Sequence, residues 1–296
     1  MITRLTGLTG LLSMLAACGS TPSRDAAAPT ETAMHDGVVA SADGTKIHYL
    51  EGGRGTTTLF FLHGWLGNAH WWDEQFAHFS PRYRVVAIDQ AGHGESGRDR
   101  KAWTMQACAQ DARAVADKLG LDRVVWIGHS MSGGTILELA NLLPERTVGL
   151  IPIDILEDVG QVATTEEKAA FFGALEKDFP TAVRAVFKED FPPGAPEPVV
   201  RRVLDEAAAA PPAISIPILR AFFDYDAASA MRKVKAPIVA VNSEMHRTNV
   251  AGNRKFAPQF DVVLMKNVGH WPMLERPGEF DLLLQQAIDR ATAKLR

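Results

Sequence analysis

One turn of the chain places a serine where it could act as a nucleophile. Residues 128–133 read Gly-His-Ser-Met-Ser-Gly, after a β-rich run at 123–127 and at the start of a helical pattern at 131–143. A serine on a sharp strand–helix turn stands at the end of a sheet, and its small neighbours relieve the crowding of the strained backbone. The amide of Met131, at the helix start, then points to where an oxyanion would form. The sequence therefore predicts Ser130 as a candidate nucleophile.

A serine hydroxyl is a poor nucleophile at neutral pH and needs a neighbouring base. Among the nine histidines, His270 directly follows the last β-rich segment. It lies on a turn between Gly269 and Pro272, where its ring can overhang the strand ends. The turn around Ser130 departs from Gly-x-Ser-x-Gly in one place, since Ser132 replaces the final glycine. Such a motif alone is common by chance, so the rest of the chain has to support it.

The composition indicates one large core, or a core with a smaller appended unit. The chain has 296 residues, of which 46% are apolar and 22% charged. A net charge of −4 gives no electrostatic footprint for nucleic acid, so we expect no nucleic-acid partner. The sequence shows no metal-ligand cluster and no phosphate-binding or dinucleotide-binding motif, so we expect no metal and no cofactor.

The first residues have the pattern of an export signal. An apolar run at 5–17 follows a short basic start and is shorter than the ~18 residues of a membrane span, which predicts a signal peptide at 1–17. Its ending, Leu-Ala-Ala-Cys, resembles a bacterial lipoprotein signal, which implies lipidation of Cys18. Residues 18–35 are small, polar and proline-punctuated, as in a flexible tether. We expect a protein of the bacterial cell envelope, attached to a membrane only through Cys18; the alternative is an ordinary cleaved signal and a secreted protein.

From about residue 36 onward, β-rich segments alternate with helical patterns. The β-rich segments are 38–40, 46–51, 57–62, 84–89, 123–127, 148–154, 237–242 and 262–265. The helical patterns are 70–79, 104–119, 131–143, 249–257 and 278–295. This alternation predicts an α/β fold with a mainly parallel sheet covered by helices on both faces. The first two segments flank a turn and predict an antiparallel hairpin.

One connection is too long for an ordinary loop. Between Asp154 and Pro237 there is no β-rich segment, only helical pieces interrupted by prolines. We therefore predict a helical cap at 156–226, inserted into a core formed by 36–155 and 227–296. Because the insertion follows the end of a strand, we expect a lid over the active site rather than a decorative excursion. We expect most of its phenylalanines to pack the cap's own helices, with a hydrophobic cleft as the alternative: Phe171, Phe172, Phe187, Phe191, Phe222 and Phe223.

Four motifs in this order resemble the α/β-hydrolase family, in the serine branch with a helical cap. Residues 61–65 read Phe-Leu-His-Gly-Trp, and residues 89–96 read Asp-Gln-Ala-Gly-His-Gly-Glu-Ser. The turn at 128–133 follows, and residues 269–277 read Gly-His-Trp-Pro-Met-Leu-Glu-Arg-Pro. The resemblance runs from about residue 37 to the C-terminus and is thinnest through the cap. It implies a mainly parallel eight-stranded sheet flanked by helices, with the cap inserted after the sixth strand.

The resemblance also implies roles for particular residues. His270 is the expected base, and the backbone N–H groups of Trp65 and Met131 are the expected oxyanion hole. The ring of Trp65 is a candidate wall of the acyl pocket. His129, just before the serine, is expected to face into the packing of the sheet.

The acid is where the sequence departs from the family pattern. The family usually takes it from the turn after the seventh strand, and here His246 occupies that position. Asp154 closes the sixth strand, a site that some capped members use, and Glu244 lies in the usual loop but two residues early. Either carboxylate could accept the second ring N–H of His270 and hold the tautomer of the imidazole. We favour Asp154, with Glu244 as the alternative.

The resemblance implies a serine esterase-like hydrolase that cleaves a carboxylic ester or related small acyl substrate through an acyl-enzyme intermediate. Lactonase, cofactor-free perhydrolase and carbon–carbon hydrolase activities are alternatives on the same residues. A serine at the turn argues against dehalogenases and epoxide hydrolases, which need a carboxylate nucleophile. A binding protein with a decayed site is the alternative from another class, and Ser130 together with His270 argues against it.

Overall fold

The computed structural model describes residues 33–293, so the predicted signal peptide, Cys18 and nearly all of the predicted tether lie outside the described residues. Eight strands form one sheet in the order β1-β2-β4-β3-β5-β6-β7-β8. The strands are β1 (His35–Ala40), β2 (Lys46–Gly53), β3 (Thr58–Leu62), β4 (Arg84–Ile88), β5 (Val124–His129), β6 (Thr147–Ile153), β7 (Ile238–Ser243) and β8 (Phe260–Met265). The pairs β1–β2 and β2–β4 are antiparallel and the remaining pairs are parallel, which confirms the predicted hairpin and the mainly parallel sheet.

The helices divide into those that cover the sheet and those that form the cap. The covering helices are the 3₁₀ turn η1 (Ala69–Trp72), α1 (Asp73–Phe79), α2 (Met105–Lys118), α3 (Ser132–Leu142), α8 (Ala227–Met231), α9 (Val250–Asn253), α10 (Pro272–Glu275) and α11 (Pro277–Thr292). The cap helices are α4 (Thr165–Lys177), α5 (Phe179–Glu189), α6 (Glu197–Ala209) and α7 (Pro212–Phe223). None of the helices within residues 33–293 combines the length and the apolar composition that a membrane span requires.

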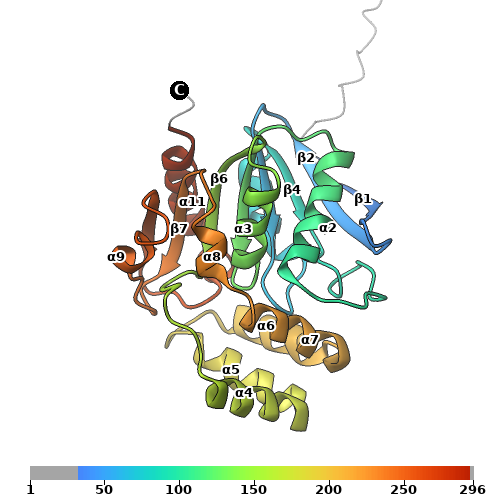
Figure 1. Cartoon of the computed structure of the whole chain (residues 1–296), viewed down its shortest axis with the longest axis vertical. Helices are drawn as coiled ribbons and strands as arrows, with labels where there is room; N and C mark the ends of the chain where they lie inside the picture. Colours follow the sequence, from blue (N-terminus) through green and yellow to red (C-terminus); the bar gives the residue numbers. More distant parts are fainter. Residues whose placement is uncertain (1–32, 294–296) are drawn as a thin grey trace, which may run out of the picture. The chain divides into compact units, whose positions relative to one another are not determined.

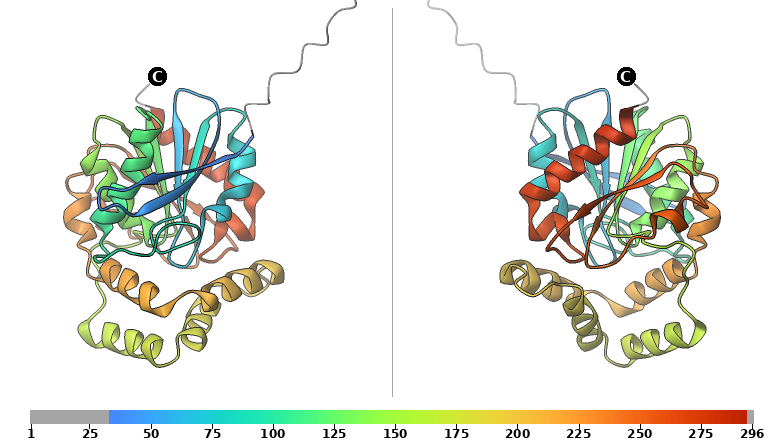
Figure 2. Two further views of the ribbon diagram at one scale, coloured as in Figure 1. Left: turned by 90° about the vertical axis from the view of Figure 1, so that its right-hand side faces the viewer. Right: turned by 90° about the vertical axis from the view of Figure 1, so that its left-hand side faces the viewer.

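The strands at the centre of the sheet are apolar on both sides because helices cover both faces. In β3, Leu59 and Phe61 join the buried cluster that includes residues of α11, whereas Phe60 and Leu62 join the cluster that includes residues of α2 and α3. This alternation is the two-residue period of a strand. Figure 1 shows α2, α3 and α8 on one side of the sheet, and Figure 2 shows α11 crossing the other side.

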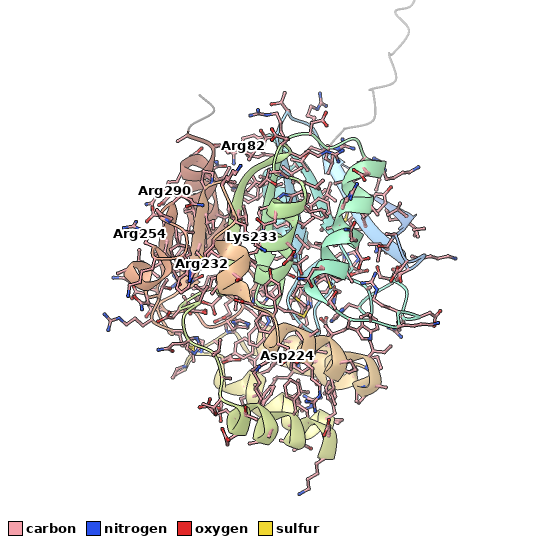
Figure 3. All side chains as sticks on the ribbon, viewed as in Figure 1. Arg82, Asp224, Arg232, Lys233, Arg254 and Arg290 are labelled. Atoms are coloured by element: carbon pink, nitrogen blue, oxygen red, sulfur yellow. The ribbon has the colours of Figure 1, made fainter. Side chains whose placement is uncertain are left out.

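The cap follows β6 and lies below the sheet in Figures 1 and 2, at the ends of the parallel strands. Hydrogen bonds fix it to the core: Trp65 Nε1 donates to the carbonyl of Ser215 on α7 (2.9 Å), and Trp71 Nε1 donates to Glu206 on α6 (2.6 Å). The chain leaves the cap at Asp224, labelled in Figure 3, and returns to the core through α8. The cap therefore covers the strand ends where the predicted site residues gather.

Two helical predictions differ from the structure. The pattern at 70–79 is divided into η1 and α1, and the pattern at 249–257 gives only the four-residue α9. The sequence of α9 favours helix weakly, since it contains Gly252 and Asn253. Asn253 is also bound by the loop after β6: its side chain donates to the carbonyl of Leu156 (2.5 Å) and accepts from the N–H of Val159 (3.0 Å). These tertiary contacts end the helix early.

Candidate active site

Ser130 occupies a left-handed turn between β5 and α3. Its φ is +51°, a conformation that costs a non-glycine residue about 1–3 kcal/mol. The N–H of Ser130 donates to the carbonyl of Ile153 (3.0 Å), and its own carbonyl accepts from Gly133 (2.8 Å). Gly128 is required because a Cβ there would lie 2.7 Å from the carbonyl oxygen of Ser132. The turn thus holds Ser130 at the carboxyl end of β5.

Ser132, the residue that breaks the glycine motif, belongs to a buried network. Its hydroxyl donates to the carbonyl of His63, and Gln90 Nε2 donates to that carbonyl (2.7 Å) and to Ser132 Oγ (2.9 Å). The N–H of Gln90 also donates to His63 Nε2 (3.0 Å). The network joins the serine turn to the loop that follows β3. Gln90 and Ser132 were not predicted as site residues, although Gln90 lies within the quoted motif at 89–96.

The loop after β3 passes directly beside the serine. A Cβ on Gly64 would lie 2.6 Å from His129 Nδ1 and 3.0 Å from Ser130 Cβ, so only glycine fits there. The next residue, Trp65, lines one cavity together with Ser130 and Met131. Within the described chain, the backbone N–H groups of Trp65 and Met131 have no acceptor. Both residues that carry these unpaired donors therefore line the cavity that contains the serine.

His270 is paired with Asp154. His270 Nδ1 lies 2.8 Å from Asp154 Oδ2, and Asp154 Oδ1 accepts the N–H of Ser243 (2.7 Å). Asp154 directly follows β6 with a φ of +46°, and its side chain is fully buried. Glu244, in contrast, is exposed, and no hydrogen bond of the described chain joins it to His270. The structure therefore places the favoured carboxylate, and not the alternative, against the imidazole.

The loop that carries His270 is held from two sides. The buried carboxylate of Glu275 accepts the N–H of Gly269 (3.0 Å) and of Trp271 (3.1 Å). On the cap side, the carbonyl of Asp190 accepts the N–H of His270 (2.9 Å), so close that a Cβ on Gly269 would collide with it at 2.1 Å. Glu275 stands in the quoted motif at 269–277, but nothing in the sequence marks Asp190.

His129 differs from its expected place. It is buried, but it reaches the His270 loop as well as the sheet: its Nε2 lies 2.6 Å from the carbonyl of His270, and the two rings are 4.7 Å apart. Burial and the neighbouring His270 hold the pKa of His129 well below its usual value. A neutral His129 therefore donates Nε2–H to the carbonyl of His270 and helps to hold the loop that carries His270.

Ser130 and His270 line the same cavity, of about 190 Å³, roofed by the cap. No hydrogen bond within the described residues joins the hydroxyl of Ser130 to the imidazole of His270. The His270 side chain is 18% exposed. Trp65 lines this cavity, as expected. The expectation that most cap phenylalanines merely pack the cap's own helices is wrong, because four of the six line the cavity: Phe171, Phe187, Phe222 and Phe223. Among residues 33–293, no group of three or more His, Cys, Asp and Glu side chains could hold a metal ion.

Carboxylates surround the imidazole and set its proton affinity. Burial lowers the pKa of His270, but the hydrogen bond and charge of Asp154, with the charges of Asp190 and Glu157, outweigh burial and raise this pKa above its usual value. The pKa of Asp154 is lowered, because the bonds from His270 and Ser243 overcome the effect of burial. The pair is therefore stabilised as imidazolium and carboxylate.

This arrangement predicts the pH dependence of activity. A base must be neutral to take a proton, so kcat/KM should fall as the pH drops through the raised pKa of His270, with a midpoint above that of an ordinary histidine. Asp190→Asn removes one carboxylate but keeps the backbone carbonyl, so the midpoint should move to lower pH. The measurement is kcat/KM for p-nitrophenyl acetate between pH 5 and 9, with the exposed neighbour variant Glu189→Gln as the control. An unchanged midpoint in Asp190→Asn would contradict this electrostatic account.

The chain matches the model of the alpha/beta hydrolase family over residues 59–281 and belongs to this family. Among curated relatives, it is 41% identical over 99 residues to a non-heme haloperoxidase of Rhodococcus erythropolis, covering 33% of this chain and 36% of the relative. It is 38% identical over 102 residues to a bifunctional esterase/perhydrolase of Acinetobacter calcoaceticus, covering 34% and 37% of the two chains. These matches span little more than a third of the relatives' length.

A solved structure extends the similarity across the fold. An N-acyl homoserine lactone degrading enzyme superposes with a TM-score of 0.73 at 26% identity, covering 84% of this chain and 99% of the other. The predicted α/β-hydrolase fold is therefore confirmed, and the family, with its esterase relatives, supports a hydrolase.

Proposed function

We propose that this protein is a serine hydrolase that cleaves a carboxylic ester through an acyl-enzyme intermediate. Ser130 Oγ attacks the acyl carbonyl carbon while His270 Nε2 takes its proton. The N–H groups of Trp65 and Met131 stabilise the oxyanion. His270 then protonates the departing alkoxide, and afterwards takes a proton from the water that releases the acid. Asp154 accepts Nδ1–H throughout, which leaves Nε2 free to accept the serine proton.

One observation carries this proposal: Trp65 and Met131, whose backbone N–H groups have no acceptor in the described chain, line the same cavity as Ser130 and His270. A backbone N–H that has no protein acceptor and lies beside a strained serine is free to bind an oxyanion. Binding the oxyanion of a tetrahedral intermediate would use both groups, and each donor of this kind contributes about 10²–10³-fold to kcat. The apolar cavity favours a small uncharged acyl group.

Lactone hydrolysis is the second candidate, because an enzyme described as degrading an N-acyl homoserine lactone is 26% identical over most of this chain. A lactone is a cyclic ester, and the same attack by Ser130 opens its ring. The leaving alkoxide then stays attached to the acyl group, so the chemistry differs only in what the cavity must contain.

The test combines labelling with turnover. A fluorophosphonate should label the wild-type protein at Ser130, and p-nitrophenyl acetate and butyrate should be hydrolysed. A γ-lactone series and peracid formation from acetate with hydrogen peroxide, assayed in parallel, rank the alternative activities. A protein that neither reacts with the fluorophosphonate nor turns over any of these substrates would refute the proposed function and favour a binding role.

A further inference from the structure

A second cavity, of about 260 Å³, lies beside the one that contains Ser130. The rings of Phe222 and Phe223 line both cavities and are the wall between them. The other walls of the second cavity come from the loop at 155–163, which leads from β6 into the cap, and from residues 225–228, where the chain returns to the core. Neither Ser130 nor His270 lines it, so it is a separate space beyond the site described above.

The backbone of the dividing wall is held by hydrogen bonds, whereas its rings contact other aromatic rings. The carbonyl of Phe223 accepts a hydrogen bond from Lys168 Nζ (2.6 Å), and Asp224 at the end of α7 donates its N–H to the carbonyl of Arg220 (2.9 Å). The rings themselves are half-buried and touch other rings: Phe223 lies 5.5 Å from Phe171 and 5.8 Å from Phe222. Aromatic contacts of this kind are individually weak, and a rotation about the side-chain bonds of these rings breaks no hydrogen bond.

The second cavity has apolar walls and an acidic rim. Ile155, Leu156 and Val159 provide apolar surface, and Val162, which is 82% exposed, stands where the cavity meets solvent. Among the described residues that line the cavity, the charged ones are all acidic: Glu157, Asp158 and Asp226. Asp158 Oδ2 accepts a hydrogen bond from Asn249 Nδ2 (2.8 Å), and Asp226 caps α8 by accepting the N–H of Ser229 (2.9 Å). These walls suit an uncharged apolar group and disfavour an anion.

We propose that the second cavity is an extension of the substrate site, which receives the far end of an uncharged apolar chain of the ester when the Phe222–Phe223 wall opens. This inference rests on the proposed function, because the apolar chain of the ester enters the second cavity from the cavity that contains Ser130. The inference implies that the enzyme acts on medium-chain esters, which are too long to fit within the first cavity alone. Each methylene that moves from water to an apolar wall strengthens binding, so two of them account for about a tenfold preference.

The kinetic test fills the second cavity without touching the first. Ala163→Trp places a large side chain in the lining, and Ala170→Trp, on the exposed surface of α4, is the matched control. We compare kcat/KM along two series: p-nitrophenyl alkanoates from acetate to decanoate, and alkyl acetates from ethyl to decyl. In at least one series, Ala163→Trp should reduce the ratio of long-chain to short-chain kcat/KM about tenfold or more, while Ala170→Trp leaves it unchanged. A ratio that Ala163→Trp leaves unchanged in both series would overturn the proposal.

A binding test separates this proposal from the proposed function. Titration calorimetry with 1-nonanol needs no turnover, and the Kd should rise about tenfold in Ala163→Trp but not in Ala170→Trp. Equal affinity for nonanol in Ala163→Trp and the wild type would overturn the subsite even if esters are hydrolysed. Weaker binding of nonanol to Ala163→Trp than to the wild type would support the subsite even if no ester is turned over. For the wild type, 9-hydroxynonanoate should bind at least tenfold more weakly than nonanol, and equal binding would refute the uncharged class.

Discussion

Ser130→Ala is expected to abolish ester hydrolysis, with kcat reduced about 10⁵-fold or more, as found when a serine nucleophile that acts as a unit with its base is removed. The substitution removes only the hydroxyl that attacks the substrate. The backbone hydrogen bonds that hold the turn at residue 130 remain in the variant. Substrate binding depends on the apolar cavity, so KM should change little. Steady-state kinetics with p-nitrophenyl acetate and loss of fluorophosphonate labelling are the measurements.

The neighbouring serine provides the matched control. Ser132→Ala removes a hydroxyl that bonds His63 and Gln90 but does not line the cavity. Its free energy of unfolding should fall by about 1–3 kcal/mol, because buried partners lose a hydrogen bond. Fluorophosphonate labelling at Ser130 should persist. In Ser130→Ala the unfolding free energy should stay within about 0.5 kcal/mol of the wild type, since no side-chain hydrogen bond is lost. If Ser130→Ala retained hydrolysis within tenfold of the wild type, another residue would be the nucleophile.

The sheet and the serine turn were predictable because local sequence determines both. Apolar runs such as that of β3 indicate strands covered on two faces, and a glycine-flanked serine between strand and helix indicates a sharp turn. The position of His270 followed from its place after the last strand. These signals are short-range, and the structure places the corresponding elements where they were expected.

The contacts between cap and core were not predictable in the same way. Asp190 holds the N–H of His270 through a backbone carbonyl, which any residue type possesses. Phe222 and Phe223 line cavities because the cap folds back on the core, and their sequence pattern equally fits packing within the cap. The short α9 depends on bonds between Asn253 and a loop almost a hundred positions earlier in the sequence. Long-range contacts of this kind leave no mark on local periodicity.

Asp154→Asn is expected to reduce kcat about 10⁴-fold while the protein stays folded. Asparagine keeps an oxygen that can accept the N–H of Ser243, but its amide group can donate to His270 Nδ1. The ring would then carry its proton on Nε2 and could not accept one from Ser130. Loss of the carboxylate also removes the main influence that raises the pKa of His270, so the acidic limb of kcat/KM should move to lower pH.

Glu244→Gln is the matched variant, because it makes the same chemical change in the loop where the family usually carries its acid. Glu244 is exposed and remote from any bond to His270, so its kcat and its pH profile should equal those of the wild type. The comparison therefore distinguishes the two carboxylates by rate and by the pH midpoint together. If Glu244→Gln loses activity and Asp154→Asn keeps it, the acid belongs to the loop after β7 and the 2.8 Å pair of Asp154 with His270 is structural.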